Sequence, residues 1–337
     1  MNKLLLSICI PTYNREEKVI ALLEKLKKET FDYRDIVEIV VAENPSTTPN
    51  NDILKNYMDR NKIFKFYCHS ENIGFSRNYY FLLNSAQSKF VWILGDDEYI
   101  VDGGIKSILE MLQNNKNYNH FLLKREGYIK DYENRVPIQT DYSDIYGLNT
   151  NIKDILLKYN KESCDSFLLS DLMFISLNIF KLSTVKKHYV SRYKEVISSG
   201  SPDMFYSDGL FLSLCMLSDG LYIHDTTSIL SNKTPGPMAW DSIKHWVTVF
   251  LIPQLIIDSN NTSFDTNFKR KLLKTYYSRS LYFFRLFLYI PKENRKVIIN
   301  FLKIEDIIYL FLNRLLYAPK IILSFFYRFI LTKIKYQ

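Results

Sequence analysis

The stretch that decides the fold reads Phe90-Val91-Trp92-Ile93-Leu94-Gly95-Asp96-Asp97-Glu98. Five apolar residues in a row are typical of a strand that is buried on both faces. Three carboxylates follow this strand after a single glycine. Adjacent like charges repel one another, so they need a cation or open solvent around them. The stretch therefore predicts a buried strand that ends in a polar turn able to attract a cation.

Upstream of this stretch, apolar runs alternate with segments whose apolar residues recur at helical spacing. Strands are expected at Leu4–Ile10, Val37–Ala42, Ile63–Cys68 and Phe90–Leu94, and helices at Arg15–Thr30, Asp52–Arg60 and Phe75–Ala86. This alternation predicts an α/β domain with a largely parallel sheet flanked by helices. The pattern loosens after residue 115, where we expect strands at Phe121–Lys124 and Met173–Leu177 and a helix at Tyr206–Ser218.

Polar side chains gather where the expected strands end. The clusters are Thr12-Tyr13-Asn14, Glu43-Asn44, Asn72 to Asn78 and Asp96 to Glu98. In open α/β sheets, ligands bind at the carboxyl ends of the strands, where the loops emerge. The four clusters are therefore expected to form one site.

The acidic turn has two interpretations. Carboxylate oxygens suit hard divalent cations such as Mg²⁺ or Mn²⁺, and these ions also bind diphosphates. Alternatively, the turn is solvated and caps a helix that begins near Asp102. The convergence of four polar clusters favours the cation site.

Four motifs, in this order, resemble the family 2 glycosyltransferases, which have the GT-A fold. They read SICIPTYNR at Ser7–Arg15, IVVAEN at Ile39–Asn44, NIGFSRN at Asn72–Asn78 and WILGDDE at Trp92–Glu98. Each motif is weak alone, but four in the family's order and spacing are specific. Within the family the chain looks most like bacterial enzymes that build O-antigen or capsule repeat units, including the abequosyltransferase-like group. The resemblance covers about the first 110 residues and returns weakly around 170–230.

The resemblance implies roles for individual residues in binding a nucleotide-sugar donor. Glu43 corresponds to an acidic residue that contacts the base or ribose, and Arg77 to a basic residue near the base and diphosphate. The expected donor-binding residues are Pro11, Thr12, Tyr13, Glu43, Arg77, Asp96 and Asp97, and the expected metal ligands are Asp96 and Glu98. Two simpler interpretations stay open: Glu43 as the cap of the following turn, and Arg77 as a solvated surface residue.

Two positions depart from the family's pattern. Glutamate replaces aspartate at position 98, the last residue of the D-x-D motif, and the extra methylene moves the carboxylate by about 1.5 Å. Ligation of Mn²⁺ or Mg²⁺ stays feasible, but the preferred metal can change. Glu43 also stands where the family has aspartate, which is a milder change because its carboxylate can still accept hydrogen bonds.

An inverting transfer needs a base that takes the proton of the acceptor hydroxyl, and a carboxylate suits this task. In the family, an acidic residue at the start of a helix in the second half of the domain supplies it. Asp208 best matches that position because Leu210, Phe211, Leu212 and Leu214 follow it, and Asp203 is the second candidate. A plain helix-capping role for Asp208 is the alternative.

The net charge of +8 over 337 residues is unevenly distributed. Residues 266–337 carry 15 Lys and Arg against 3 Asp and Glu, whereas the remaining residues have a net charge of −4. We divide the chain into a GT-A domain at 1–235, with a nucleotide-sugar half at 1–115 and an acceptor half at 116–235, and a basic helical region at 236–337. Apolar and basic helix faces favour attachment to an anionic membrane, for example beside a polyprenyl-linked acceptor. The alternative is that this region packs on the domain. Its charge alone is a weak argument that it binds nucleic acid.

Composition narrows the compartment and the chemistry. The four cysteines lie far apart in the sequence, which argues against a disulfide framework or a zinc site. The apolar run near the N-terminus is too short for a signal peptide. A cytoplasmic enzyme, peripheral on the inner face of a bacterial plasma membrane, is expected. No P-loop, nucleophile elbow or dinucleotide-binding motif is present. The rival hypotheses are a non-catalytic membrane-associated binding protein on a degenerate scaffold, and a transferase with a soluble or protein acceptor.

Overall fold

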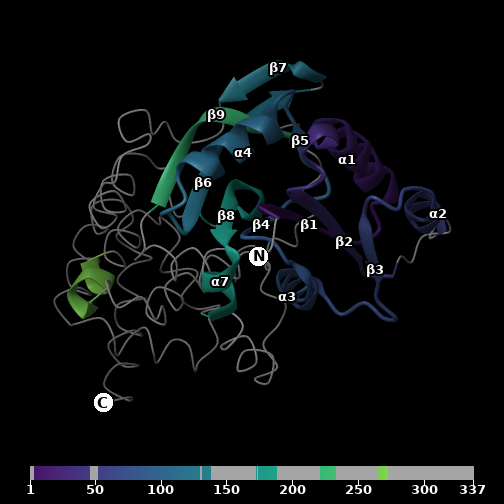
Figure 1. The fold of residues 1–337 in the computed structure, drawn as a ribbon, viewed down its shortest axis with the longest axis horizontal. Coiled ribbons are helices and arrows are strands. Elements are labelled where there is room, and N and C mark those ends of the chain that lie inside the picture. The colour runs from purple at the N-terminus through teal and green to yellow at the C-terminus, as the bar shows by residue number, and fades with distance from the viewer. Residues whose placement is uncertain are drawn as a thin grey trace, which may run out of the picture. The chain divides into compact units, whose positions relative to one another are not determined.

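The computed structural model describes residues 4–45, 52–129, 131–137, 172, 174–187, 221–232 and 265–271. The described strands form one nine-stranded sheet in the order β3-β2-β1-β4-β8-β6-β9-β5, with β7 paired to β6 (Figure 1). The first four of these strands are parallel to one another, and the others run in mixed directions. The expected parallel arrangement therefore holds for the N-terminal half of the sheet.

The N-terminal half follows the expected elements closely. It comprises β1 (Leu6–Thr12), α1 (Glu16–Glu29), η1 (Phe31–Tyr33), β2 (Val37–Glu43), α2 (Asp52–Arg60), β3 (Lys65–Cys68), α3 (Phe75–Ser85) and β4 (Phe90–Ile93). Strands β1, β2 and β4 are buried along their whole length. They are mostly apolar, as strands of a parallel sheet that is covered on both faces usually are. Strand β3, at the edge of the sheet, is half-buried to exposed.

The second half contains strands of very different lengths, and most of them pair across long sequence distances. It comprises β5 (Tyr99–Ile100), α4 (Gly104–Asn114), β6 (His120–Ile129), β7 (Asp131–Pro137), η2 (Ile175–Leu177), β8 (Asn178–Lys181), α7 (Leu182–Val185) and β9 (Leu221–Asn232). The strand expected at Met173–Leu177 is displaced: a 3₁₀ turn occupies Ile175–Leu177, and the strand begins at Asn178. The Asn178 amide donates to the Leu172 and Phe174 carbonyls, at 3.1 and 2.8 Å, and so stabilises a turn before the strand.

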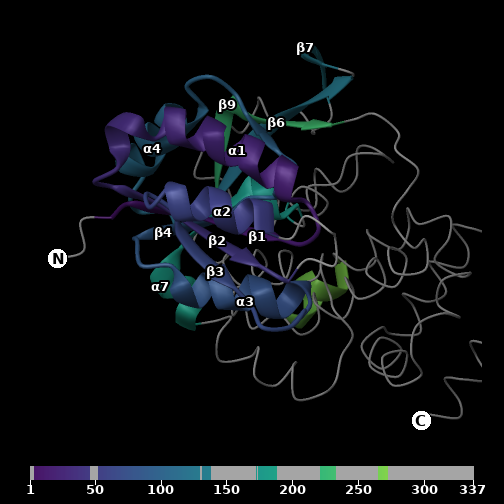
Figure 2. The same cartoon turned by 90° about the vertical axis from the view of Figure 1, so that its right-hand side faces the viewer.

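Helices cover both faces of the sheet. Helices α1 and α4 lie on one face, and α3 and α7 lie on the other (Figures 1 and 2). Helix α1 buries Val19, Leu22, Leu23 and Leu26, which recur at helical spacing. In α/β sheets covered in this way, ligands bind at the carboxyl ends of the strands.

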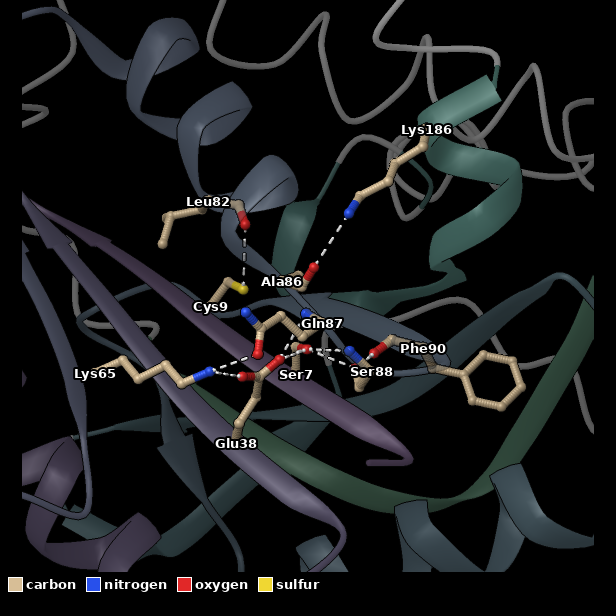
Figure 3. A network of polar contacts seen from close by, with 10 residues as sticks. All are labelled: Ser7, Cys9, Glu38, Lys65, Leu82, Ala86, Gln87, Ser88, Phe90 and Lys186. Atoms are coloured by element: carbon tan, nitrogen blue, oxygen red, sulfur yellow. Dashed lines mark hydrogen bonds and ion pairs between the residues drawn. The ribbon is translucent and has the colours of Figure 1, made fainter. Parts of the chain in front are cut away.

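Opposite the strand ends that carry the polar clusters, the amino ends of the parallel strands are joined by a buried polar network (Figure 3). The Glu38 carboxylate on β2 accepts hydrogen bonds from the Ser7 hydroxyl, from Lys65 Nζ at 2.6 Å and from the Gln87 backbone N–H at 2.7 Å. The Ser88 backbone N–H donates to Ser7 Oγ at 3.2 Å. Burial alone would raise the pKa of Glu38, but these donors bring it below its usual value. The network ties β1, β2, β3 and the start of β4 together.

Removing this carboxylate should destabilise the fold. We expect Glu38→Ala to lower the free energy of unfolding by about 2–3 kcal/mol, because buried donors lose their acceptor while Lys65 can still reach water. Urea-induced unfolding followed by circular dichroism measures the change. The matched control is Asp59→Ala, which breaks an exposed 2.9 Å pair with Lys62 and should leave the free energy of unfolding nearly unchanged. Equal losses in the two variants would contradict this role of the network.

The chain divides into two compact units, Met1–Ile152 with Ser170–Gly236, and Lys153–Leu169 with Pro237–Gln337. The sheet belongs to the first unit. The helix expected at Tyr206–Ser218 and almost all of the basic region lie outside the described residues, so the boundary at residue 235 and the membrane-binding role of that region stay predictions. Within the described ranges, no helix is long and apolar enough to cross a membrane.

Candidate active site

Strand register brings the polar clusters together at the carboxyl edge of the parallel strands. Thr12 is paired with Glu43 across β1 and β2, and Glu43 is paired with Cys68 across β2 and β3. On the other side of β1, the Leu94 backbone N–H donates to the Cys9 carbonyl at 2.9 Å, and the acidic turn begins directly after it. The ends of four strands thus meet at one edge, as the sequence predicts.

Asp96 is the best-fixed side chain of this edge. It is 6% exposed, accepts a hydrogen bond from Thr12 Oγ1 at 2.8 Å, and pairs with Arg15 Nη1 at 2.9 Å. Burial raises the pKa of Asp96, while Arg15 and Thr12 act in the opposite direction. The first and last motifs of the domain are therefore joined directly, although they are more than 80 residues apart.

The rest of the acidic turn is more open. Asp97 is exposed and pairs with Arg15 Nη1 at 2.8 Å, and Glu98 is half-buried. Ser176 supports the turn, because its hydroxyl accepts from the Gly95 backbone N–H at 3.0 Å and its carbonyl accepts from Trp92 Nε1 at 2.8 Å. Strand β5 separates the turn from α4, whose N-cap is Gly103 with no side-chain cap. The turn is therefore not the cap of that helix.

Glu43 ends β2 with a buried side chain, 3% exposed. Burial, and to a smaller extent the charge of Glu16, raise its pKa to about 7, against a smaller opposing effect of the Cys68 thiol. Glu43 lies within the strand and its carbonyl accepts from the His69 backbone N–H at 3.0 Å. The carboxyl group of Glu43 is thus on the border between neutral and ionised near neutral pH.

Buried asparagines shape the loop that carries the third motif. The Asn44 side-chain oxygen accepts a hydrogen bond from the Ile73 backbone N–H at 3.1 Å, and its amide nitrogen donates to the Gly74 carbonyl at 3.4 Å. Gly74 has φ 78°, which glycine adopts without a steric penalty, and α3 starts right after it. Asn78 donates to the Ala42 carbonyl at 2.8 Å and contacts His69 Nε2 at 3.1 Å. These contacts bind α3 to the end of β2.

The remaining predicted donor-binding residues occupy the same region. Pro11 is buried in β1, and Tyr13 follows the strand with 39% of its surface exposed. Arg77 lies in the first turn of α3 and is exposed. Asp208 and Asp203, the candidates for the base, lie outside the described residues. The roles of all these residues stay predictions.

The acidic turn offers few preformed protein ligands for a metal ion. Within the described ranges, no group of three His, Cys, Asp or Glu side chains is placed to hold an ion. The acidic turn supplies oxygen ligands, which hard divalent cations prefer, and such ions commonly keep water and take phosphate oxygens as further ligands. The residues thus fit a cation that shares its coordination with a bound diphosphate, and the roles of Asp96 and Glu98 as its ligands stay predictions.

Comparison with known proteins identifies the domain. Residues 7–167 match the model of glycosyl transferase family 2. These residues form a family 2 glycosyltransferase domain. The match extends beyond the first 110 residues, which carry the four motifs. It confirms the predicted family and the expected class of enzyme.

Two curated relatives are glycosyltransferases. The abequosyltransferase RfbV of Salmonella typhimurium is 24% identical over 236 residues, covering 61% of this chain and 70% of that protein. The GalNAc(5)-diNAcBac-PP-undecaprenol beta-1,3-glucosyltransferase of Campylobacter jejuni is 29% identical over 129 residues, covering 36% of this chain and 40% of that protein. The chain thus spans less than half of the second relative's length.

Solved structures share the fold. S. aureus TarS 1–349 in complex with UDP-GlcNAc has a TM-score of 0.58 at 15% identity, with 93% of this chain and 91% of that chain covered. The mannosyltransferase PcManGT from Pyrobaculum calidifontis, in complex with GDP-Man and Mn²⁺, has a TM-score of 0.52 at 12% identity and covers 98% and 85%. The predicted GT-A fold is confirmed.

The buried Glu43 should make the stability of the folded protein depend on pH. Its pKa is about 7 in the folded protein against an ordinary value of 4.5, so the folded state holds this proton more tightly and loses stability as the pH rises through this window. We expect Glu43→Gln, which cannot ionise, to be more stable than the wild type at pH 8 by about 1–2 kcal/mol, and by much less at pH 5, allowing for partial access of water.

Urea unfolding at pH 5 and pH 8 measures this difference. The exposed Glu17 on α1 provides the control, and Glu17→Gln should change stability by less than about 0.5 kcal/mol at either pH. A stability gain of Glu43→Gln that is the same at both pH values would show that Glu43 is ionised throughout.

Proposed function

We propose that the protein transfers a sugar, with inversion, from a nucleotide-diphosphate sugar to a glycan acceptor, and that transfer requires Mn²⁺ or Mg²⁺. The observation that carries the proposal is the convergence of Thr12, Arg15 and the buried Asp96 at the carboxyl edge of β1 and β4. This is where an α/β sheet binds its ligands. The family of the domain, and relatives named as sugar transferases, support the same activity.

In this proposal the residues at the strand ends hold the donor. Thr12 and Tyr13 line the nucleotide, Glu43 and Arg77 lie toward the base and ribose, and Asp96 and Glu98 hold the divalent ion. That ion, when bound, stabilises the negative charge that develops on the departing diphosphate. Thr12 and Arg15 hold Asp96 at the strand ends before the donor binds, so the position of this carboxylate is set in advance.

The transfer step makes one bond and breaks one bond. Asp208 takes the proton of the acceptor hydroxyl, and the hydroxyl oxygen attacks the anomeric carbon from the face opposite the leaving group. The bond between the anomeric carbon and the diphosphate oxygen breaks, and its electron pair leaves with the nucleoside diphosphate. The product carries the inverted anomeric configuration.

The acceptor in this proposal is a lipid-linked oligosaccharide of bacterial surface polysaccharide synthesis. One relative acts, by its name, on a diphosphoundecaprenol-linked glycan, and another is an abequosyltransferase. The local net charge of +12 in residues 266–337 supports attachment to the inner face of the plasma membrane. Sedimentation with anionic liposomes tests this attachment: loss of binding after deletion of residues 266–337 is expected, and equal binding of both forms would remove the membrane argument.

A panel of nucleotide sugars tests the transferase activity itself. With Mn²⁺ present, at least one donor should release its nucleoside diphosphate slowly to water and faster with a suitable acceptor. Chelation of the metal should abolish both rates. If no donor is bound or hydrolysed, the proposal fails and a non-catalytic binding protein becomes the better description.

A further inference from the structure

Arg15 holds the acidic turn from a different part of the chain. A single guanidinium nitrogen, Nη1, lies 2.9 Å from Asp96 Oδ1 and 2.8 Å from Asp97 Oδ2. Its positive charge therefore bridges two neighbouring carboxylates. The resemblance to family 2 glycosyltransferases assigns no role to Arg15, although Arg15 belongs to the first motif.

The backbone around Arg15 fixes where this charge lies. Asn14 has φ 55°, the left-handed conformation that asparagine tolerates better than most residues, and it turns the chain from β1 into α1. Arg15 is the N-cap of α1, and its carbonyl accepts from the Val19 backbone N–H at 3.0 Å. The backbone of Arg15 is thus fixed between a buried strand and a helix that buries one face, and the guanidinium can move mainly by side-chain rotation.

A divalent ion on Asp96 would have to share the carboxylate with this guanidinium. Thr12 already donates to Asp96 Oδ2, and Arg15 donates to Asp96 Oδ1. A guanidinium keeps its charge at any practical pH, so protonation changes cannot remove it. Two cations at contact distance from one carboxylate repel each other strongly in a partly buried site. The approach of the ion is therefore opposed until Arg15 moves or more negative charge arrives.

A diphosphate supplies that negative charge. Arginine binds phosphate oxygens with a planar fork of donors, and such charge-assisted hydrogen bonds are stronger than neutral ones. The Arg15 side chain is 45% exposed, so it is accessible to a ligand at the strand ends. The described residues also offer no preformed group of three metal ligands, and phosphate oxygens would complete the coordination.

We propose that Arg15 is a built-in counter-cation of the acidic turn, which holds Asp96 and Asp97 in the empty site and turns to the donor diphosphate when the divalent ion enters. This inference rests on the proposed function. Its consequence is an order of binding: the ion binds weakly to the empty enzyme and tightly only together with the nucleotide. Arg15 acts as a positioning residue for the turn and as a diphosphate-binding residue in the loaded state.

Mn²⁺ binding without any nucleotide tests this role directly. The electron paramagnetic resonance signal of free Mn²⁺ can be titrated with wild type, Arg15→Gln and Arg15→Lys. Arg15→Gln removes the competing charge and should bind Mn²⁺ alone on the order of 5–10-fold more tightly than the wild type. Arg15→Lys keeps the charge but cannot form the same planar contacts, and should lie between the two. Arg34→Gln, which changes an arginine that stacks on Phe31 away from the site, should match the wild type.

The second arm adds UDP or GDP to the same titrations. Arg15→Gln should bind the nucleotide with Mn²⁺ on the order of 10-fold more weakly, because a charged contact to the diphosphate is lost. Unchanged Mn²⁺ affinity of Arg15→Gln without nucleotide, with normal nucleotide-dependent binding in the wild type, would overturn the inference and leave the proposed function intact. If Arg15→Gln does not fold, Mn²⁺ binding to Arg15→Lys that is no tighter than to the wild type overturns it equally. Absence of Mn²⁺ binding in all forms, with and without nucleotide, would contradict both proposals.

Discussion

Replacing Asp96 by alanine is expected to lower the rate of sugar transfer on the order of 10³-fold or more. Asp96 joins Thr12 and Arg15 to the end of β4, so its loss removes a donor- and metal-binding carboxylate and frees two groups that it positions. Release of nucleoside diphosphate in the presence of Mn²⁺ measures the effect. Asp96→Asn, which keeps the shape of the side chain, should lose nearly as much because the charge is what the ion needs.

The control for this experiment is Asp102→Ala, in the same connection between β4 and α4. The Asp102 side chain is 93% exposed and pairs with Lys25 on α1, so it should retain close to wild-type activity. Both variants should remain folded, since the core of the sheet is untouched. Full activity of Asp96→Ala, and activity that survives chelation of the metal, would contradict the proposed site.

Replacing Asp208 by asparagine is expected to lower kcat by about 10²–10⁴-fold while donor binding stays unchanged. The reason is that asparagine cannot take the proton of the acceptor hydroxyl, whereas the donor is held by residues of the N-terminal half. Single-turnover transfer and calorimetric binding of the nucleotide separate the two effects. Asp208 lies outside the described residues, so this expectation depends on its sequence context alone.

Asp203→Asn provides the matched comparison for the base. It lies five residues upstream in the same stretch and should keep most of the activity if Asp208 is the base. A large loss in Asp203→Asn with little loss in Asp208→Asn would reverse the assignment. Weaker donor binding in Asp208→Asn would instead indicate a structural role for this residue.

The N-terminal half of the fold could be predicted from sequence because local pattern and burial agree there. Strands β1, β2 and β4 are mostly apolar, and α1 keeps its apolar residues at helical spacing, so expected and observed bounds differ by at most about two residues. The carboxyl-end location of the site followed from the same alternation of strands and helices. Local sequence therefore determines this half of the architecture.

The second half could not be predicted because its strands depend on distant partners. Strand β9 contains His224, Asp225 and four Ser or Thr residues and pairs in parallel with β6, about 100 residues earlier. Strand β8 begins with Asn178, which is buried against His120 at 2.7 Å, so a polar pair stands where the sequence pattern requires apolar residues. No periodicity in a single segment indicates such pairings.

The candidate site was only partly visible for the same reason. The acidic turn and Thr12 stand out in their motifs, but the bridge from Arg15 to Asp96 and Asp97 spans more than 80 residues and appears only in three dimensions. Ser176, which orients Gly95, lies in a segment with no recognisable motif. The contacts that hold the acidic turn thus join distant segments, and the motifs alone do not predict them.

Calorimetric titration of UDP and GDP, with and without Mn²⁺, tests most directly whether the acidic turn is the metal and diphosphate site. The wild type should bind at least one of the nucleotides at least 10-fold more tightly when Mn²⁺ is present, and Glu98→Ala should lose this gain. Nucleotide binding that is the same with and without Mn²⁺, or a gain that Glu98→Ala retains in full, would contradict the assignment.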